Sequence, residues 1–272
     1  MIRLAVRVAR ADAEVALAEL LALAPNGVEE VDCGELVEFA VYGVPGELPA
    51  LPDLRAAAGD AVVEVETTEI GDDWVDGWKR FHAPVLVADR LHVRPPWTEP
   101  LGRAGVDEIV IDPAQAFGTG SHATTRMCLE LLVEIEPAGS LADLGCGSGV
   151  LAIAAAKLGW SPVRAVDLEL AALEAARANV AANAVSVDVA RADLRRQAPP
   201  VAGTVAANLL RPLLLELPPR MATAPPRTLV AGGLLRSEAD EVADAFATVG
   251  LAESGRRESG DWAALLLERS RR

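Results

Sequence analysis

Three glycines at alternate positions follow an acidic residue near the middle of the chain. Residues 141–150 read LADLGCGSGV, in which the acid and the glycines are Asp143, Gly145, Gly147 and Gly149. Residues without a Cβ let the backbone turn tightly beside a ligand, and the apolar helix that begins after this turn directs its first N–H groups into the same gap. The spacing therefore predicts a site for a nucleotide-like ligand between a buried strand and a helix.

The position of the third glycine narrows the class of ligand. A dinucleotide fingerprint, G-x-G-x-x-G, would need a glycine at position 150, where the chain has Val150. An α/β protein that binds a flavin, a nicotinamide or no ligand is the alternative. The pattern resembles motif I of the S-adenosylmethionine-dependent methyltransferases. That resemblance implies that Asp143 and the glycine turn lie against the methionine end of the cofactor, and that Asp167, at the end of the next predicted strand, binds both ribose hydroxyls.

A second motif lies between Asp112 and Thr125, which read DPAQAFGTGSHATT. Its glycines loosen a loop whose hydroxyl and imidazole groups can cap the following helix, and such a loop can cover a cofactor. The motif resembles, nearly residue for residue, the signature of the bacterial ribosomal protein methyltransferase A family, which methylates the eleventh protein of the large ribosomal subunit. The resemblance extends over residues 72–268 and includes the segments 72–82, 208–213 and 232–240.

The resemblance assigns cofactor contacts to four positions, which are Thr125, Gly145, Asp167 and Asn208. Thr125 and Gly145 would hold the methionine part of S-adenosylmethionine, and Asn208 would lie where the methyl group leaves. Asp193, near the end of the third predicted strand of this domain, is a candidate for the adenine amino group, with an ordinary loop aspartate as the alternative.

Three residues are candidates for the transfer itself. Asn208 ends a predicted strand, and its amide carbonyl would orient the lone pair of a neutral amine toward the sulfonium methyl group; this asparagine can equally be a helix N-cap, and both roles can hold at once. Phe117 would help to desolvate a lysine, which lowers the pKa of the amine, and its ring face would stabilise the sulfonium. His122 is either a proton acceptor or a structural cap at a helix start.

The family resemblance implies a reaction and a partner. We expect an enzyme that transfers methyl groups from S-adenosylmethionine to lysine side chains of a large-subunit ribosomal protein, with the N-terminal amine as a second target. The same chemistry on another protein or on a small amine is one alternative. A non-catalytic adaptor that keeps the cofactor fold on the ribosome is another, although a scaffold has no physical need for polar groups such as Asp143 and Asn208 at strand ends.

The composition limits the kinds of partner that the protein can bind and the cellular compartment in which we expect it. The 272 residues include 40 acidic and 25 basic side chains, a formal charge of −15, which argues against nucleic-acid binding through phosphates and favours a basic partner or a merely solubilising acidic surface. The cysteines at 33, 128 and 146 have neither disulfide nor zinc spacing, so we expect no metal and a reducing compartment. No apolar run approaches ~20 residues, and we expect a cytoplasmic monomer without a membrane segment.

Apolar periodicity divides the chain into three parts. Residues 1–68 read as a small ferredoxin-like α+β domain that recognises the substrate, and residues 69–84 as a linker helix whose aromatic stripe docks it onto a core. Residues 85–272 alternate strands and helices, which predicts a Rossmann-like α/β domain with the seven-stranded sheet of class I methyltransferases. Its predicted strands lie near 140–144, 163–167, 185–190, 203–208 and 227–231, before a hairpin at 250–257 and 261–268, and its helices at 122–135, 149–158, 169–182, 212–221 and 236–248.

Overall fold

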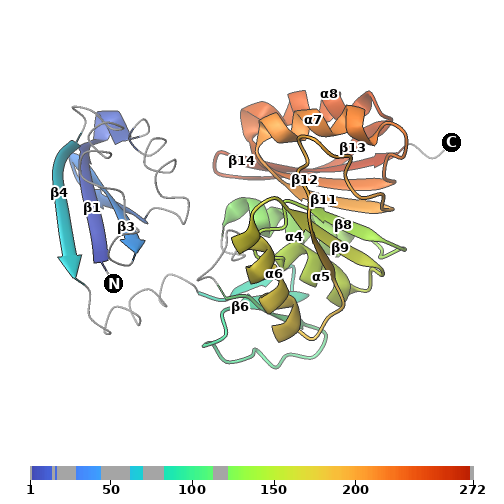
Figure 1. Ribbon diagram of the computed structural model, residues 1–272, viewed down its shortest axis with the longest axis horizontal. Coiled ribbons are helices and arrows are strands. Elements are labelled where there is room, and N and C mark those ends of the chain that lie inside the picture. The colour runs from blue at the N-terminus through green and yellow to red at the C-terminus, as the bar shows by residue number, and fades with distance from the viewer. Residues whose placement is uncertain are drawn as a thin grey trace. The chain divides into compact units, whose positions relative to one another are not determined.

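The computed structural model divides into two compact units, Met1–Phe81 and His82–Arg272 (Figure 1). The structure describes residues 2–13, 16, 29–43, 62–69, 83–112 and 122–269. Nearly all of the predicted linker helix, including the aromatic residues Trp74, Trp78 and Phe81, lies outside these ranges.

The first unit contains a four-stranded antiparallel sheet in the order β2-β3-β1-β4. This order, with strands β1 and β2 parallel and separated by β3, is that of the predicted ferredoxin-like fold. Apolar side chains at alternate positions of β1, such as Leu4 and Val6, face a core with Phe39. The elements are β1 (Ile2–Ala9), a 3-10 turn η1 (Arg10–Asp12), β2 (Glu29–Cys33), β3 (Leu36–Gly43) and β4 (Val62–Glu69).

The opposite face of this sheet carries a ladder of charges. Arg3 and Arg7 point away from the core, and both donate to the carboxylate of Glu38, at 2.5 and 2.7 Å. Arg7 also donates to Glu64 on the neighbouring strand, at 2.6 Å. The bond from Arg3, opposed by burial, lowers the pKa of Glu38, which keeps this nearly buried carboxylate ionised.

The second unit is built on a seven-stranded sheet in the order β10-β9-β8-β11-β12-β14-β13 (Figure 1). Neighbouring strands are parallel except around β14, which pairs antiparallel with both β12 and β13. The predicted class I methyltransferase topology is therefore confirmed. The strands are β8 (Leu141–Leu144), β9 (Val163–Asp167), β10 (Asp188–Arg191), β11 (Thr204–Asn208), β12 (Thr228–Leu235), β13 (Leu251–Ser259) and β14 (Trp262–Arg269).

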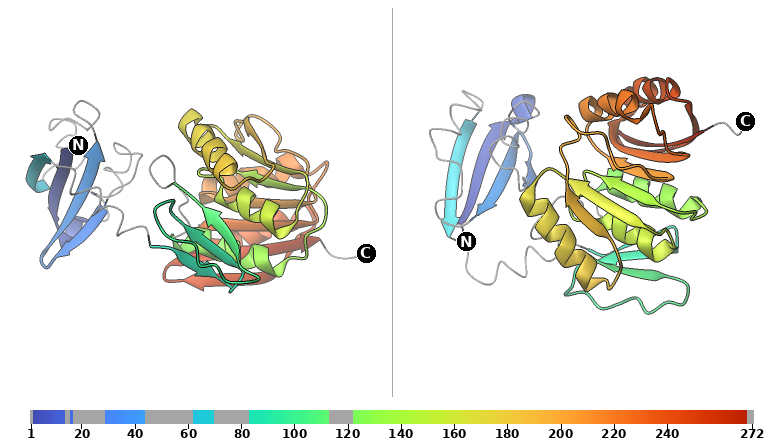
Figure 2. Two further views of the ribbon diagram at one scale, coloured as in Figure 1. Left: turned by 90° about the horizontal axis from the view of Figure 1, so that it is seen from below. Right: turned by 45° about the vertical axis from the view of Figure 1, so that its right-hand side comes forward.

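Helices cover both faces of this sheet (Figure 2). Odd-numbered residues of β8, beginning with Leu141, face α4 and α5, whereas Ala142 and Leu144 face the layer of α7 and α8. The alternation determines that Asp143 points toward α4 and α5. The helices are α4 (Ala123–Glu134), α5 (Val150–Leu158), α6 (Leu170–Ala182), α7 (Arg211–Met221) and α8 (Ala239–Ala247), the last preceded by a 3-10 turn η3 (Arg236–Glu238).

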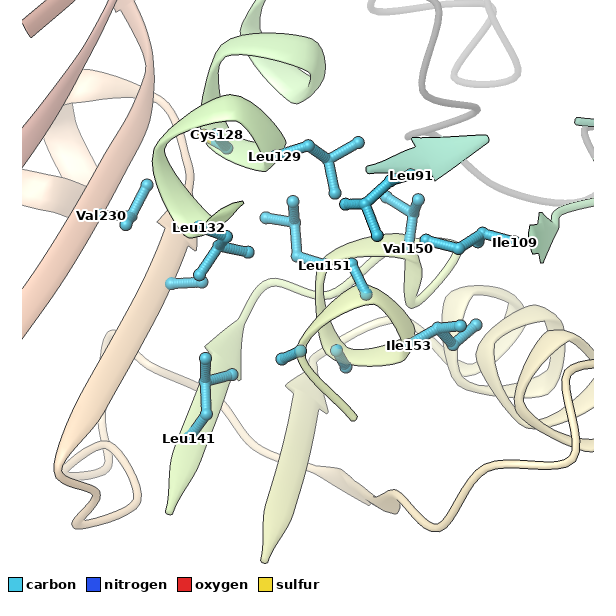
Figure 3. Packing of buried hydrophobic residues seen from close by; sticks show 14 of the residues in the cluster. Leu91, Ile109, Cys128, Leu129, Leu132, Leu141, Val150, Leu151, Ile153 and Val230 are labelled. Atoms are coloured by element: carbon cyan, nitrogen blue, oxygen red, sulfur yellow. The ribbon is translucent and has the colours of Figure 1, made fainter. Parts of the chain in front are cut away.

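A three-stranded sheet extends the α4–α5 layer. Its strands are β5 (Val85–Val87), β6 (Leu91–Arg94) and β7 (Asp107–Val110), with β6 in the centre. Leu91 and Ile109 from this sheet pack into the same core as Val150 and Leu151 of α5, as Figure 3 shows. The residues ahead of the second motif are thereby fixed beside the glycine turn. Across the part of the chain that the structure describes, no helix has the length and apolar character needed to cross a bilayer.

Candidate functional site

The glycine turn joins β8 to α5 at the carboxyl edge of the large sheet. Gly145, Gly147 and Gly149 have φ values of 69°, 51° and 80°, a left-handed conformation that favours residues without a Cβ. The N–H groups of Gly145 and Cys146 both donate to the carbonyl of Val166 on β9, at 2.8 and 3.0 Å. The turn is therefore anchored to the neighbouring strand before the helix begins.

Asp143 is a buried carboxylate at the base of this turn, with 1% of its surface exposed. Its Oδ2 accepts the N–H of Ala152 in the first turn of α5, at 3.0 Å. Its Oδ1 is buried and has no hydrogen-bond partner among the residues that the structure describes. Burial raises the pKa of Asp143 to about 7, and the charge of Asp167 acts in the same direction. Near neutral pH this group therefore exchanges between the neutral and the ionised form.

Asp167, at the end of β9, accepts a backbone hydrogen bond on each of its carboxylate oxygens. Its Oδ2 accepts the N–H of Gly147 at 2.9 Å, and its Oδ1 accepts the N–H of Glu169 at 3.0 Å. The second carboxylate therefore connects the glycine turn to the loop that follows β9. Its position at the carboxyl edge is where the sequence placed the ribose-binding acid.

Asn208 and Thr125 meet although they are 83 residues apart. Asn208 ends β11, the strand next to β8, and Thr125 is buried in the first turn of α4. The Nδ2 group of Asn208 donates to Oγ1 of Thr125 at 3.3 Å, whereas its Oδ1 is buried and has no partner among the described residues. The structure thus brings into contact two residues to which the family resemblance assigns different parts of the cofactor.

Leu209 is a residue of this edge that the sequence analysis missed. Its N–H donates to the carbonyl of Gly232 at 3.1 Å. A Cβ built on Gly145 would overlap its Cδ2, and a Cβ on Gly233 would overlap its carbonyl oxygen. The residue after Asn208 therefore lies between the glycine turn and a bulge in β12. An apolar side chain carries no chemical signal, so only the three-dimensional contact shows this role.

Cys128 is a second residue whose position could not be anticipated. It lies one turn after Thr125 on the buried face of α4, and burial raises the pKa of its thiol, which keeps it protonated. A Cβ on Gly232 would overlap its Sγ and come within 3.0 Å of Oδ1 of Asn208. The absence of a side chain at position 232 thus makes room for the thiol and the amide together.

His122 caps the start of α4. Its Nδ1 lies 2.8 Å from Oγ1 of Thr124 and accepts the N–H of the same residue at 3.4 Å, while its ring packs edge-on against Trp262 at 5.2 Å between centroids. Burial lowers the pKa of His122, so the imidazole is neutral near pH 7. These contacts correspond to the capping alternative for this histidine, and its role as a proton acceptor stays a prediction.

The other two candidates differ in how far the structure describes them. Asp193 lies two residues after β10. The N–H of Ala192, directly before it, donates to the carbonyl of Asp167 at 2.9 Å. Its Oδ1 accepts the N–H of Arg195 at 3.0 Å, and its Oδ2 lies 3.5 Å from Nε of Arg196. The carboxylate thus orders its own turn, and adenine binding stays a prediction. Phe117 lies outside the described residues.

A cavity at the opposite edge of the sheet has a different character. It has a volume of about 50 Å³ and lies at the amino end of β11, lined mostly by apolar groups such as Pro200, Val201 and Met221. Because no carboxylate or side-chain amide lines it, it cannot fix the hydroxyl and amino groups of a nucleoside. Within the described ranges, no three His, Cys, Asp or Glu side chains are placed to hold a metal ion.

Comparisons with known proteins agree with this architecture. A family model described as "Ribosomal protein L11 methyltransferase (PrmA)" matches residues 53–270. The chain belongs to this family.

Relatives and a solved structure extend over the same part of the chain. The ribosomal protein L11 methyltransferase of Symbiobacterium thermophilum is 38% identical over 198 residues, which are 72% of this chain and 65% of that protein. The protein of the same name from Pelotomaculum thermopropionicum is 38% identical over 216 residues, 78% of this chain and 70% of the relative. A crystal structure of ribosomal protein L11 methylase from Lactobacillus delbrueckii subsp. bulgaricus has a TM-score of 0.63 at 26% identity, and covers 70% of this chain and all of that one.

The raised pKa of Asp143 predicts a pH-dependent stability. Between its ordinary value of 3.8 and about 7, the folded protein binds one proton more than the unfolded chain, so the free energy of unfolding falls as pH rises through this range. Asp143→Asn cannot titrate and should remove this part of the slope, which denaturant unfolding at several pH values measures. Asp188→Asn, an exposed residue of β10, is the matched control. Equal slopes for wild type and Asp143→Asn would contradict the assignment.

The crowding around Gly232 predicts a paired effect. Gly232→Ala should destabilise the protein by about 1–3 kcal/mol, because Sγ of Cys128 must move to admit the new methyl group. Cys128→Ala should cancel part of that loss in the double variant, since it empties the same space. Unfolding of wild type, both single variants and the double variant measures the coupling. Strictly additive losses would show that the two side chains do not compete.

Proposed function

We propose that this protein transfers methyl groups from S-adenosylmethionine to amino groups of ribosomal protein L11, on lysine side chains and at the N-terminal amine. Membership of the family and the names of its relatives support the substrate. The observation that carries the reaction is the contact between Thr125 and Asn208 beside the glycine turn. It directs an amide toward the edge at which a class I methyltransferase fold binds its cofactor.

S-adenosylmethionine is the cofactor, and the side chains at this edge fit it. The cofactor carries an ammonium and a sulfonium, and Asp143 and Asn208 each offer a buried acceptor oxygen without a protein partner among the described residues. Asp167 offers a carboxylate for the ribose hydroxyls, and the left-handed turn at Gly145 lets the backbone come close. When bound, the cofactor supplies a methyl carbon that a nitrogen lone pair can attack.

The protein must present the substrate amine without its proton. A free lysine has a pKa of ~10.4, so forming its neutral amine near pH 7.5 costs about 4 kcal/mol, and an α-amine with a pKa near 8 costs far less. Desolvation at this edge reduces that cost, because burial disfavours the charged amine. Oδ1 of Asn208 can then accept an N–H of the neutral amine, which aligns the lone pair for an in-line attack.

The first unit is our candidate for holding L11. The proposed domains are residues 1–68 for substrate recognition, 69–84 as linker and 85–272 for methyl transfer. The net charge of −15 supports a basic protein partner and disfavours direct contact with nucleic acid. We further propose that the protein acts as a monomer in the cytoplasm, where it meets its ribosomal substrate.

Mass spectrometry tests the proposal directly. The purified protein is incubated with unmethylated L11 and isotopically labelled S-adenosylmethionine, and a second basic ribosomal protein serves as the control substrate. We expect labelled methyl groups on lysines and the N-terminus of L11 and none on the control. Transfer to the control alone would favour the same chemistry on another amine. Saturable cofactor binding without any transfer would favour the adaptor alternative.

The proposed role of Asn208 predicts a loss of rate. Asn208→Ala removes the oxygen that orients the amine and should lower kcat for L11 methylation by about 100-fold. Thr125→Val removes the group that receives Nδ2 of Asn208 and should give a smaller loss. Steady-state kinetics with L11 measure both effects, and Asp188→Asn serves as the control with kcat unchanged. A wild-type kcat in Asn208→Ala would remove this residue from the mechanism.

A further inference from the structure

Two buried asparagines lie one turn apart, one inside α6 and one at its C-terminal cap. Asn179 lies within the alanine-rich helix and is 3% exposed, and Asn183 directly follows the last helical residue and is 8% exposed. Asparagine is a poor helix former, and a buried side-chain amide needs partners for its donors and its acceptor. The bonds that these two amides make therefore indicate what they do.

Asn183 pairs with the backbone of β7. Its Oδ1 accepts the N–H of Val110 at 2.8 Å, and its Nδ2 donates to the carbonyl of the same residue at 2.6 Å. One side chain thus satisfies a residue at the end of β7 in the way that a neighbouring strand would. Its Nδ2 also donates to the carbonyl of Asn179 at 2.8 Å. Asn183 therefore secures the small sheet to the end of α6, and its side-chain bonds do not reach the glycine turn.

Asn179 joins two segments of the candidate site. Its Oδ1 accepts the N–H of Asp112 at 3.0 Å, and its Nδ2 donates to the carbonyl of Ser148 at 2.9 Å. Ser148 lies between the last two glycines of the turn and is fully buried. Asp112 begins the second motif, whose other end is held by the His122 cap of α4. A single amide therefore links the cofactor turn to the start of the motif that leads to Thr125.

We propose that Asn179 is a positioning residue for S-adenosylmethionine binding, because it fixes the glycine turn and the start of the second motif relative to each other. The inference rests on the cofactor site of the proposed function, and it concerns binding, not the identity of the methyl acceptor. Both bonded groups belong to the backbone, so this amide contributes directly to the distance between the two segments. Without the bridge, the two segments are less closely fixed relative to each other, and restoring their spacing when the cofactor binds weakens affinity.

Calorimetric titration with S-adenosylmethionine tests the proposal. Asn179→Ala should weaken cofactor affinity by about tenfold or more, since both bonds are lost. Asn179→Asp keeps an acceptor for the N–H of Asp112 but has no donor for Ser148, and should show a comparable loss. Asn183→Ala is the matched control: it removes the side-chain bonds to the backbone of Val110 and Asn179 at the end of the same helix, leaves both side-chain bonds of Asn179 in place, and should lower the thermal midpoint while affinity stays within about twofold.

Two results of this titration would overturn the positioning role of Asn179. Wild-type cofactor affinity in either Asn179 variant would overturn the positioning role, because the bridge would then not matter for binding. An equal loss of affinity in Asn183→Ala would also overturn it, because the loss would then reflect general destabilisation. If the Asn179 variants fail to fold, hydrogen exchange of the wild-type protein replaces them. Cofactor should then slow exchange at the amide of Asp112 together with the glycine turn, and an unchanged Asp112 would overturn the proposal. Absence of L11 methylation by the wild type would instead reject the proposed function and leave the affinity comparison intact.

Discussion

Two carboxylates that receive backbone N–H groups hold the glycine turn in place, and the rest of the site depends on them. The turn places three residues in the left-handed region, so it needs external partners to keep one conformation. Asp143 receives an N–H of α5 and Asp167 receives that of Gly147. Because the strands are parallel, both acids, the turn and Asn208 reach the same edge of the sheet.

Asp143 combines a structural and a functional requirement that conflict. Burial makes its ionised form unfavourable, and its Oδ1 has no hydrogen-bond partner among the described residues, so its pKa rises to about 7. A neutral side chain would suit the fold better, but it would not attract a cation. Proteins commonly retain such locally unfavourable groups where a ligand requires them. Oδ1 of Asn208, on the neighbouring strand, is likewise buried with no partner in the part of the chain that the structure describes.

The sequence predicted the elements better than the contacts. Strands and helices of the second unit agree with the structure within a few residues, because apolar periodicity and the glycine turn are local signals. β12 was expected at 227–231 but continues to Leu235, since the bulge at Gly232 and Gly233 bends the strand without ending it. The roles of Leu209 and Cys128 depend on segments distant in the chain. Asn179 could have been identified from the sequence, because an asparagine inside an alanine-rich helix indicates a side chain with specific hydrogen-bond partners.

The position of α4 has a consequence for how the protein is made. This helix precedes the large sheet in the chain, yet it packs on β11, β12, β13 and β14, with His122 against Trp262 and Glu134 paired with Arg257. During translation its apolar face has no completed surface to cover until residue 269 has emerged. The surface that α4 covers, and with it the surroundings of Thr125, is therefore complete only after the last strands have been synthesised. Until then, the apolar face of α4 is an exposed hydrophobic surface, of the kind that makes incompletely folded chains prone to aggregation.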